Sequence, residues 1–232
     1  MTQAVILAAG IGRRFDNTPF HHPKALIPLI HGQTILAFQL EALAHFFSPT
    51  QIRVVVGYQK EKIVQQFATL SYVINPMFAQ ENTAKSLLRG LNGVEEDLLF
   101  LNGDVVFHWT VVEKLLQKNR TAMIVNREKV GEEEVKYRTD GQKKILEVSK
   151  RLLKPEGEAL GINYIQGADL SLLKKKLEVC SCQDYFERGI ELAIEEGMRI
   201  WAEPVAEGMC VEIDFPEDLV RANQLIQGWH CM

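Results

Sequence analysis

The sequence predicts an α/β fold in which a mixed, mostly parallel sheet is flanked by helices and extended by an antiparallel C-terminal elaboration. Strand-like and helix-like segments alternate from residue 5 to residue 104, as is typical of a parallel sheet covered on both faces. The middle of the chain instead holds successive strands, two of them joined by a hairpin turn at residues 139–142. No linker composition or internal repeat divides the 232 residues, so we expect a single domain over residues 1–232.

The first half is predicted to alternate regularly. Leu36, Leu40, Leu43 and Phe47 form one apolar stripe, which indicates a helix over residues 34–47. Strands are indicated by short apolar runs rich in β-branched residues, and further helices by 3.6-residue periodicity. The expected strands are 5–8, 52–58, 71–75 and 97–104, and the further helices are 61–68 and 81–91.

The second half is predicted to be strand-rich before it returns to helix. Phe186, Ile190 and Ala193 share one face, which favours a helix over residues 182–196. Pro216 stands at the first turn of a closing helix, 216–227, where its missing N–H costs little. The expected strands are 121–126, 132–138, 143–149, 157–166, 199–205 and 209–214.

Composition excludes several classes of protein. The net charge of −4 argues against a general nucleic-acid binder. No apolar run reaches the roughly 18 residues of a membrane span, and the N-terminus shows no positively charged leader. We therefore expect a cytoplasmic protein without nucleic-acid or membrane partners; the oligomeric state is open. The four cysteines lack zinc-site spacing, which favours reduced thiols: Cys180, Cys182, Cys210 and Cys231.

A glycine-containing loop with cationic residues follows the first strand, in the segment "LAAGIGRRFDNTPFHHPKAL". A dinucleotide-binding fingerprint would need a third glycine where Phe15 stands, and a P-loop would need Lys24 to follow a glycine rather than Pro23. Two interpretations remain. Backbone N–H groups and cations could wrap a triphosphate, or the segment could be a tight turn with solvated arginines.

The segment "LAAGIGRR" with the later "HPKAL" resembles the signature L-A-A-G-x-G-x-R…P-K of nucleotidyltransferases that act on sugar phosphates and related small phosphates. The resemblance implies a Rossmann-like nucleotidyltransferase fold. It also implies that backbone near Leu7, Ala8, Ala9, Gly10 and Gly12 approaches a nucleotide. Arg14 and Lys24 would then be the catalytic cations that bind its phosphates.

Two acidic positions follow predicted strands. Asp104 lies just beyond a strand end, where ligands of open α/β sheets bind. Glu212 and Asp214 are two residues apart on a strand and so point to the same side, a costly arrangement without a nearby cation. Either aspartate could instead cap a turn or helix. The resemblance implies that Asp104, beside the nucleotide, and Asp214 hold Mg²⁺, which suits few carboxylates plus phosphate oxygens.

Further segments resemble the phosphocholine cytidylyltransferase branch. Asn82 and Ser86, four apart on one expected helix face, match its N-x-x-x-S-L segment near the nucleotide, although Asn82 could simply be a helix cap. Tyr185 and Glu187 match an aromatic-plus-acid pair of that branch. An aromatic face with a nearby carboxylate is suited to binding a quaternary ammonium group, but Tyr185 could equally belong to the helix core.

Three further residues are candidate substrate contacts. Glu212 adds a second carboxylate for a cationic head group. Lys150 is a candidate for the substrate phosphate and Glu158 for the head group, although a charged hairpin surface would also explain these two residues.

These features together predict an Mg²⁺-dependent cytidylyltransferase. CMP would pass from CTP to a small phosphorylated alcohol or phosphonate, with release of pyrophosphate. A phosphocholine-like acceptor is favoured. Two alternatives stay open: a sugar-1-phosphate nucleotidyltransferase that uses UTP, dTTP or GTP, and a non-catalytic nucleotide-binding module.

Overall fold

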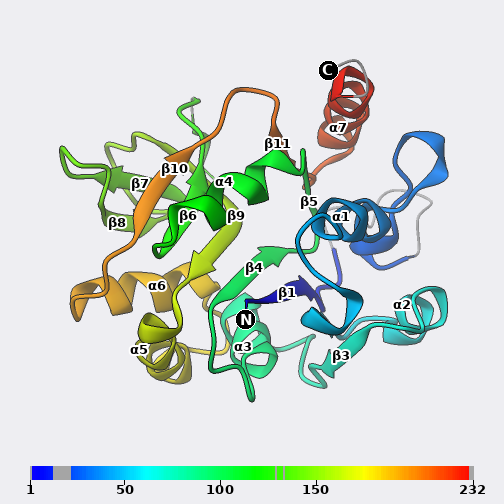
Figure 1. The fold of residues 1–232 in the computed structure, drawn as a ribbon, viewed down its shortest axis with the longest axis horizontal. Helices are drawn as coiled ribbons and strands as arrows, with labels where there is room; N and C mark the ends of the chain where they lie inside the picture. Colours follow the sequence, from blue (N-terminus) through cyan, green and yellow to red (C-terminus); the bar gives the residue numbers. More distant parts are fainter. Residues whose placement is uncertain (1, 13–21, 129, 133, 230–232) are drawn as a thin grey trace.

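The computed structural model describes residues 2–12, 22–128, 130–132 and 134–229. Within these ranges, a nine-stranded sheet has the strand order β10-β6-β9-β4-β1-β2-β3, with β7 and β8 joined beside β9 (Figure 1). One half of this sheet is parallel throughout, because β1 pairs with β2 and β4, and β2 pairs with β3. Its strands are β1 (Gln3–Ala8), β2 (Ile52–Val56), β3 (Ser71–Ile74) and β4 (Leu98–Asn102).

The other half of the sheet is mixed. β9 (Gly157–Ile165) runs antiparallel to both β4 and β6 (Ala122–Val125), and β10 (Trp201–Pro204) lies parallel to β6. The hairpin of β7 (Lys136–Thr139) and β8 (Ile145–Ser149) extends from β9. The predicted mixed sheet with an antiparallel elaboration is thus confirmed.

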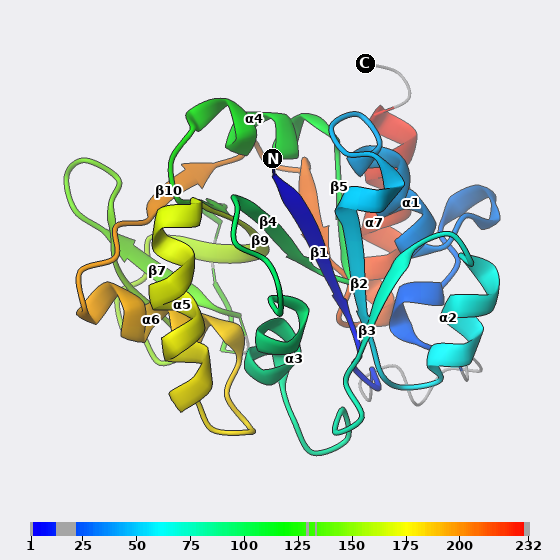
Figure 2. The ribbon, with the colours of Figure 1, turned by 60° about the horizontal axis from the view of Figure 1, so that its bottom comes forward.

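Helices cover both faces of the sheet, and alternation along the strands explains why. In β1, Val5 and Leu7 pack toward α3 (Thr83–Gly90), α5 (Gly167–Val179) and α6 (Phe186–Glu195). Ala4 and Ile6 point the other way, toward α1 (Ile35–Leu43), α2 (Lys60–Gln66) and α4 (Thr110–Lys118). Figure 2 shows α3, α5 and α6 on one side of the strands and α1 and α2 on the other. Central strands apolar on both faces are what such a sandwich requires.

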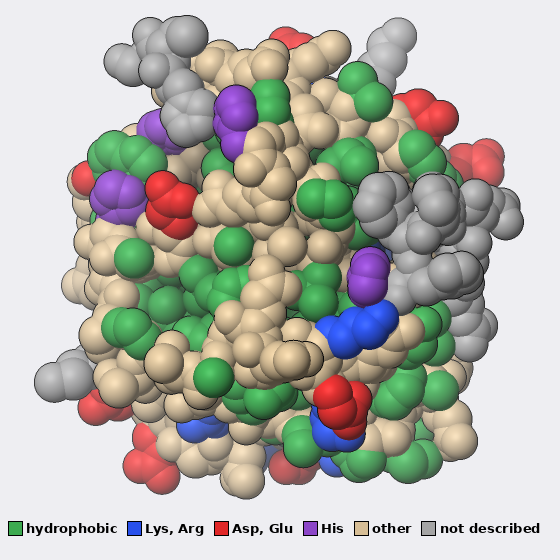
Figure 3. All heavy atoms as spheres, turned by 90° about the vertical axis from the view of Figure 1, so that its right-hand side faces the viewer, with side chains coloured by type: hydrophobic (Ala, Val, Ile, Leu, Met, Phe, Trp, Pro, Cys, Tyr) green, Lys and Arg blue, Asp and Glu red, His purple; other side chains and the backbone are tan. Residues whose placement is uncertain are grey.

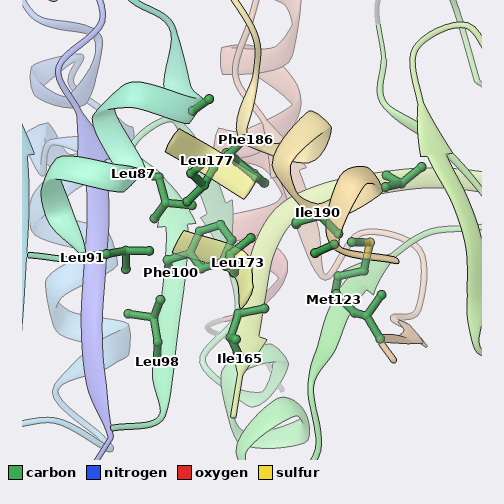
Figure 4. Close-up of a cluster of buried hydrophobic side chains, with 14 of the residues drawn as sticks. Leu87, Leu91, Leu98, Phe100, Met123, Ile165, Leu173, Leu177, Phe186 and Ile190 are labelled. Atoms are coloured by element: carbon green, nitrogen blue, oxygen red, sulfur yellow. The ribbon is translucent and has the colours of Figure 1, made fainter. Parts of the chain in front are cut away.

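The larger core cluster lies under α3, α5 and α6. Phe100 of β4 meets Phe186 of α6 edge-to-face, with ring centroids 5.0 Å apart. Leu87 and Leu173 close the same cluster from α3 and α5 (Figure 4). This packing anchors the start of α6 on the central strands.

A small second sheet carries the C-terminal end of the chain back to the centre. β11 (Cys210–Glu212) pairs antiparallel with β5 (Val105–Phe107), which follows directly after β4. The closing helix α7 (Pro216–Trp229) then packs on α1, where the ring centroids of Trp229 and Phe38 lie 6.0 Å apart. The pairing brings residues about 100 positions apart in the chain to the same edge of the main sheet.

Several element predictions were wrong or incomplete. The helix expected at residues 182–196 begins only at Phe186, because the carbonyls of Cys182 and Asp184 accept hydrogen bonds from α3. The strand expected at 97–104 stops at Asn102 and resumes as β5 after a turn. α4 and α5 were not predicted, although Leu170, Leu173 and Leu177 of α5 show helical spacing.

The surface of the described residues bears on possible partners. No helix in the described ranges combines the length and apolar character that crossing a bilayer requires. Figure 3 looks onto the right-hand side of Figure 1 and shows few charged side chains there, with no continuous basic patch among the residues in colour.

Candidate active site

A cavity of about 570 Å³ opens at the carboxyl ends of β1 and β4. Residues from the first loop, the start of α3, the β4–β5 turn, β9, the start of α6 and the end of β11 line it. This edge is where open α/β sheets bind ligands, because the strand ends leave a crevice between diverging connections.

The glycine loop forms one wall of the cavity. Leu7, Ala8, Gly10 and Gly12 line it, whereas Ala9 lies behind and its carbonyl accepts the N–H of Tyr58. Gly12 has a φ of +72°, and a β-carbon there would lie 3.2 Å from Cβ of Lys24. Glycine therefore lets the loop turn closely over this lysine. Arg14 lies outside the described residues.

Lys24 joins the two aspartates that the sequence singles out. Its Nζ donates to Oδ2 of Asp104 at 2.7 Å and to Oδ1 of Asp214 at 2.6 Å. The lysine side chain is only 14% exposed. Burial by itself would lower the pKa of Lys24, but the two carboxylates outweigh it and raise the pKa above its ordinary value. The lysine is therefore a fixed cation.

Hydrogen bonds from neighbouring segments fix the turn that carries Asp104. The N–H of Gly103 donates to the carbonyl of Leu7 at 2.9 Å, and a β-carbon on Gly103 would lie 2.6 Å from that oxygen. The fully buried side chain of Gln39 donates from Nε2 to the carbonyls of Asn102 and Val105, both at 2.8 Å. These contacts fix where the carboxylate of Asp104 points.

Asp218 caps the start of the closing helix. The carboxylate of Asp218 accepts hydrogen bonds from the backbone N–H groups of Asp214 and Phe215 at 2.9 and 2.7 Å. An acidic residue at the third position of a helix commonly accepts from the backbone N–H groups that precede the helix in this way. The side chain of Asp214 itself faces Lys24. The N–H of Ile213 also donates to the carbonyl of Asp104 at 3.0 Å, so the two aspartate segments are bonded together.

The pair of aspartates fits a magnesium ion. Oδ1 of Asp104 is buried and accepts no hydrogen bond from any described residue. Mg²⁺ binds through one or two carboxylates together with substrate phosphates and water rather than through an all-protein cage. In the part of the chain that the structure describes, no group of three or more His, Cys, Asp or Glu side chains is placed to hold a metal ion.

The start of α3 places only one of its two predicted residues in the cavity. Asn82 lines the cavity and is the N-cap of α3, where its Oδ1 accepts the N–H of Thr83 at 2.8 Å. Ser86 does not line it; its hydroxyl is buried and accepts a hydrogen bond from Asn75 at 3.1 Å. The shared helix face is not realised, because Asn82 precedes the first helical turn.

The predicted acidic residues of the substrate side do converge. Glu158, Glu187 and Glu212 all line the cavity. Burial raises the pKa of Glu158 to about 7, with repulsion from Glu134 and Glu128 adding to it despite a hydrogen bond from Asn126. Burial, then the charges of Asp104 and Asp214, raise the pKa of Glu212 well above its ordinary value.

Glu187 is the most deeply buried of these acids. It is 7% exposed, and its Oε2 accepts no hydrogen bond from a described residue. Burial raises the pKa of Glu187 to about 7, although backbone N–H at the start of α6 and Lys150 act in the opposite sense. Such a carboxyl titrates near neutrality and would gain from a nearby cation.

Lys150 and Tyr185 form a pair at the rim. The Nζ of Lys150 lies 4.4 Å from the ring centroid of Tyr185, which is 40% exposed and is therefore not part of the α6 core. An ammonium over an aromatic face is attractive. The aromatic face that the sequence predicts for a head group thus already meets a cation of the chain.

Two asparagines at strand ends were missed by the sequence analysis. Asn102 ends β4 and donates to Oε1 of Glu212 at 3.2 Å, while Asn126 follows β6 and donates to Oε2 of Glu158 at 2.9 Å. Both line the cavity. A polar residue directly after a buried apolar strand is the signal that could have found them.

A family comparison covers the first two thirds of the chain. The model of the MobA-like NTP transferase domain matches residues 4–161, which include the glycine loop, Lys24, Asp104 and Glu158. The chain belongs to this family. The MobA-like NTP transferase match ends before α6 and β11, so Glu187, Glu212 and Asp214 lie beyond it.

Similar proteins span several nucleotidyltransferases. The chain is 31% identical to the bifunctional protein GlmU of Methanococcus maripaludis over 95% of its own length, but it spans only 53% of that relative. The inositol-1-phosphate CTP transferase of T. maritima has a TM-score of 0.80 at 18% identity, covering 98% of this chain and 97% of that one. The CTP:phosphocholine cytidylyltransferase of Streptococcus pneumoniae has a TM-score of 0.77 at 17% identity, covering 97% and 99%. The chain therefore shares the fold of these transferases and about half the length of the curated relative.

Proposed function

We propose that this protein is an Mg²⁺-dependent cytidylyltransferase. It transfers CMP from CTP to a small phosphorylated alcohol or phosphonate with a cationic head group, and it releases pyrophosphate. The acceptor that we propose first is phosphocholine or a molecule like it. The observation that carries the proposal is the contact of Lys24 with both Asp104 and Asp214 beneath a glycine loop. That grouping combines phosphate-binding and metal-binding functions in one place.

The chain's own groups have distinct roles in this reaction. Backbone near Gly10 and Gly12 approaches the triphosphate, and Lys24, with Arg14, neutralises its charge. Asp104 and Asp214 would hold Mg²⁺, which when bound reduces the repulsion between the α-phosphate and the incoming phosphate. Because a phosphate monoester is already mostly deprotonated near pH 7, the reaction needs no general base.

Catalysis then rests on positioning and charge. The incoming phosphate oxygen attacks the α-phosphorus, the bond to the pyrophosphate oxygen breaks, and pyrophosphate leaves. Lys24 is held by two carboxylates, so its charge is in place before the reaction and little reorganisation is needed. Lys150, at the rim beside Tyr185, can reach toward the phosphate of the acceptor.

The acidic wall supports a cationic head group. Glu158, Glu187 and Glu212 line the cavity, and each has a pKa raised chiefly by burial. A ligand cation among them would favour their ionised forms and would be bound in return. A neutral sugar offers no such compensation. Two structural neighbours are named as CTP transferases, which supports cytosine as the base.

A substrate panel tests this proposal. CTP, UTP, dTTP and GTP are each combined with phosphocholine, phosphoethanolamine, aminoethylphosphonate, inositol phosphate and glucose 1-phosphate, and pyrophosphate release is measured. We expect release with CTP and an amine-bearing acceptor, and none from the Lys24→Ala variant. Preference for another nucleotide with glucose 1-phosphate would instead establish the sugar-phosphate alternative. Nucleotide binding without release in any combination would establish a non-catalytic module.

A further inference from the structure

Two chain segments that lie about 100 residues apart run side by side at the floor of the cavity. Residues 80–84 lead into α3, and residues 182–186 lead into α6. Figure 2 shows the connection between α5 and α6 passing beside α3. The N–H of Asn82 donates to the carbonyl of Cys182 at 2.7 Å, and the N–H of Ala84 donates to that of Asp184 at 3.2 Å. We call this contact the α3–α6 seam.

Side chains extend the seam on both sides. Nε2 of Gln183 donates to the carbonyl of Gln80 at 2.8 Å, and Nδ2 of Asn82 donates to the carbonyl of Gln183 at 3.2 Å. At the centre, Oγ1 of Thr83 accepts the N–H of Phe186 at 3.0 Å. Thr83 is the first residue of α3, and Phe186 is the first residue of α6.

Each helix start therefore supplies hydrogen-bond acceptors for the backbone N–H groups of the other. The first N–H groups of a helix have no partner inside the helix. α6 has Tyr185 at its N-cap, which forms no side-chain capping bond, so the hydroxyl of Thr83 supplies the missing acceptor. In return, the carbonyl of Asp184 accepts from the first turn of α3. Neither helix start can shift without loss of a hydrogen bond in the other.

The seam lies between the two proposed halves of the site. Asn82 and Gln80 line the cavity on the nucleotide side, and Tyr185 and Glu187 line it on the head-group side. Glu187 is in the first turn of α6, so its direction depends on how that turn is anchored. The side chain of Thr83 is the direct link from one wall to the other.

We propose that Thr83 is a positioning residue that couples the nucleotide wall to the head-group wall through the backbone of Phe186. This proposal rests on the proposed function for its assignment of the two walls. Nucleotide bound beside Asn82 fixes the position of the start of α3. Through the hydrogen bonds of the seam, it thereby also fixes the positions of Tyr185 and Glu187 at the start of α6. Binding of the nucleotide therefore strengthens binding of the phosphorylated acceptor, and the reverse holds equally.

The test compares Thr83→Val with Thr83→Ser. Valine keeps the size of the side chain but removes the acceptor, whereas serine keeps the hydroxyl. Hydrogen exchange over residues 182–188 needs no substrate. We expect exchange at least about 5-fold faster in Thr83→Val, the effect of losing one part-buried hydrogen bond, and near wild-type exchange in Thr83→Ser. Equal rates in wild type and Thr83→Val would overturn the proposal.

Steady-state kinetics separates positioning from general damage. For Thr83→Val we expect two KM values to rise by similar factors of about 5- to 10-fold: that of the acceptor with the nucleotide saturating, and that of the nucleotide with the acceptor saturating. The kcat should be nearly unchanged, and Thr83→Ser should restore both KM values. A rise in only one of the two KM values, or no rescue by serine, would contradict a coupling role.

Two further measurements keep the outcome decisive. In wild type, CTP should slow exchange over residues 182–188, and Thr83→Val should abolish this protection. If Thr83→Val does not fold, Gln183→Ala removes another bond of the seam from an exposed side chain and should show the same rise in both KM values. If no nucleotide and acceptor pair releases pyrophosphate, the proposed function fails, while the substrate-free exchange still decides whether Thr83 anchors α6.

Discussion

The ammonium of Lys24 lies 2.6 Å from the carboxylate of Asp214, although 190 positions separate the two residues in the chain. The same ammonium lies 2.7 Å from Asp104. Three segments thus meet at one cation: the end of the first loop, the β4–β5 turn, and the connection between β11 and α7. Each of these segments is held by backbone hydrogen bonds of its own, so the contact is built into the fold.

Replacing this cation or its partner should abolish turnover. We expect Lys24→Ala and Asp104→Ala each to lower kcat/KM by at least about 100-fold, the scale of losing one preorganised electrostatic contact. Pyrophosphate release measures it, and Lys118→Ala, an exposed lysine of α4, is the matched control. Wild-type turnover by a folded Lys24→Ala protein would refute its assigned role.

Removal of divalent metal should have the same effect. Chelation by EDTA is expected to stop pyrophosphate release, and excess Mg²⁺ should restore it. Binding of Mn²⁺ in the presence of CTP, followed by electron paramagnetic resonance, should weaken at least about 10-fold in Asp104→Asn, because one of two carboxylate ligands loses its charge. Turnover that persists in EDTA would contradict a metal-dependent mechanism.

Glu187 should make the ligand-free protein less stable at high pH. Its pKa is raised from 4.5 to about 7 by burial, so the folded state holds a proton that the unfolded state releases. The free energy of unfolding therefore falls as the pH rises from about 4.5 to about 7. Above pH 7 the whole of this loss of stability remains.

The neutral variant Glu187→Gln isolates this effect. We expect it to increase the free energy of unfolding by about 1–3 kcal/mol at pH 8 and to change it little at pH 5. Urea titrations at the two pH values measure it, with the exposed Glu178→Gln as control. An equal gain at both pH values would show that the carboxyl is not the cause.

Gly103 should tolerate no side chain. A β-carbon there would lie 2.6 Å from the carbonyl oxygen of Leu7, so Gly103→Ala must displace the turn that carries Asp104. We expect it to destabilise the fold by about 1–3 kcal/mol and to lower kcat/KM. Gly141→Ala is the matched control, because a β-carbon there meets no atom within 4 Å. Similar thermal unfolding of both variants would contradict the close approach.

The sequence alone determined the alternation of strands and helices and the main chemical groups. Apolar periodicity predicted the elements of the first half because strands and helices bury their faces at different intervals. The glycine loop and Lys24 were singled out by a short signature that follows the first strand and resembles a family motif, and Asp104 and Asp214 by their positions at strand ends together with that resemblance. Local patterns survive folding, so these predictions needed no knowledge of the sheet order.

Only the tertiary structure decided which of these groups meet. The pairing of β5 with β11 brings Asp104 and Asp214 together, and sequence spacing does not encode that pairing. Ser86 contacts Asn75 instead of the cavity, and residues 182–185 form no helix because the carbonyls of Cys182 and Asp184 accept the N–H groups of Asn82 and Ala84. Contacts between distant segments override local preference when they satisfy buried donors that a local structure would leave without partners.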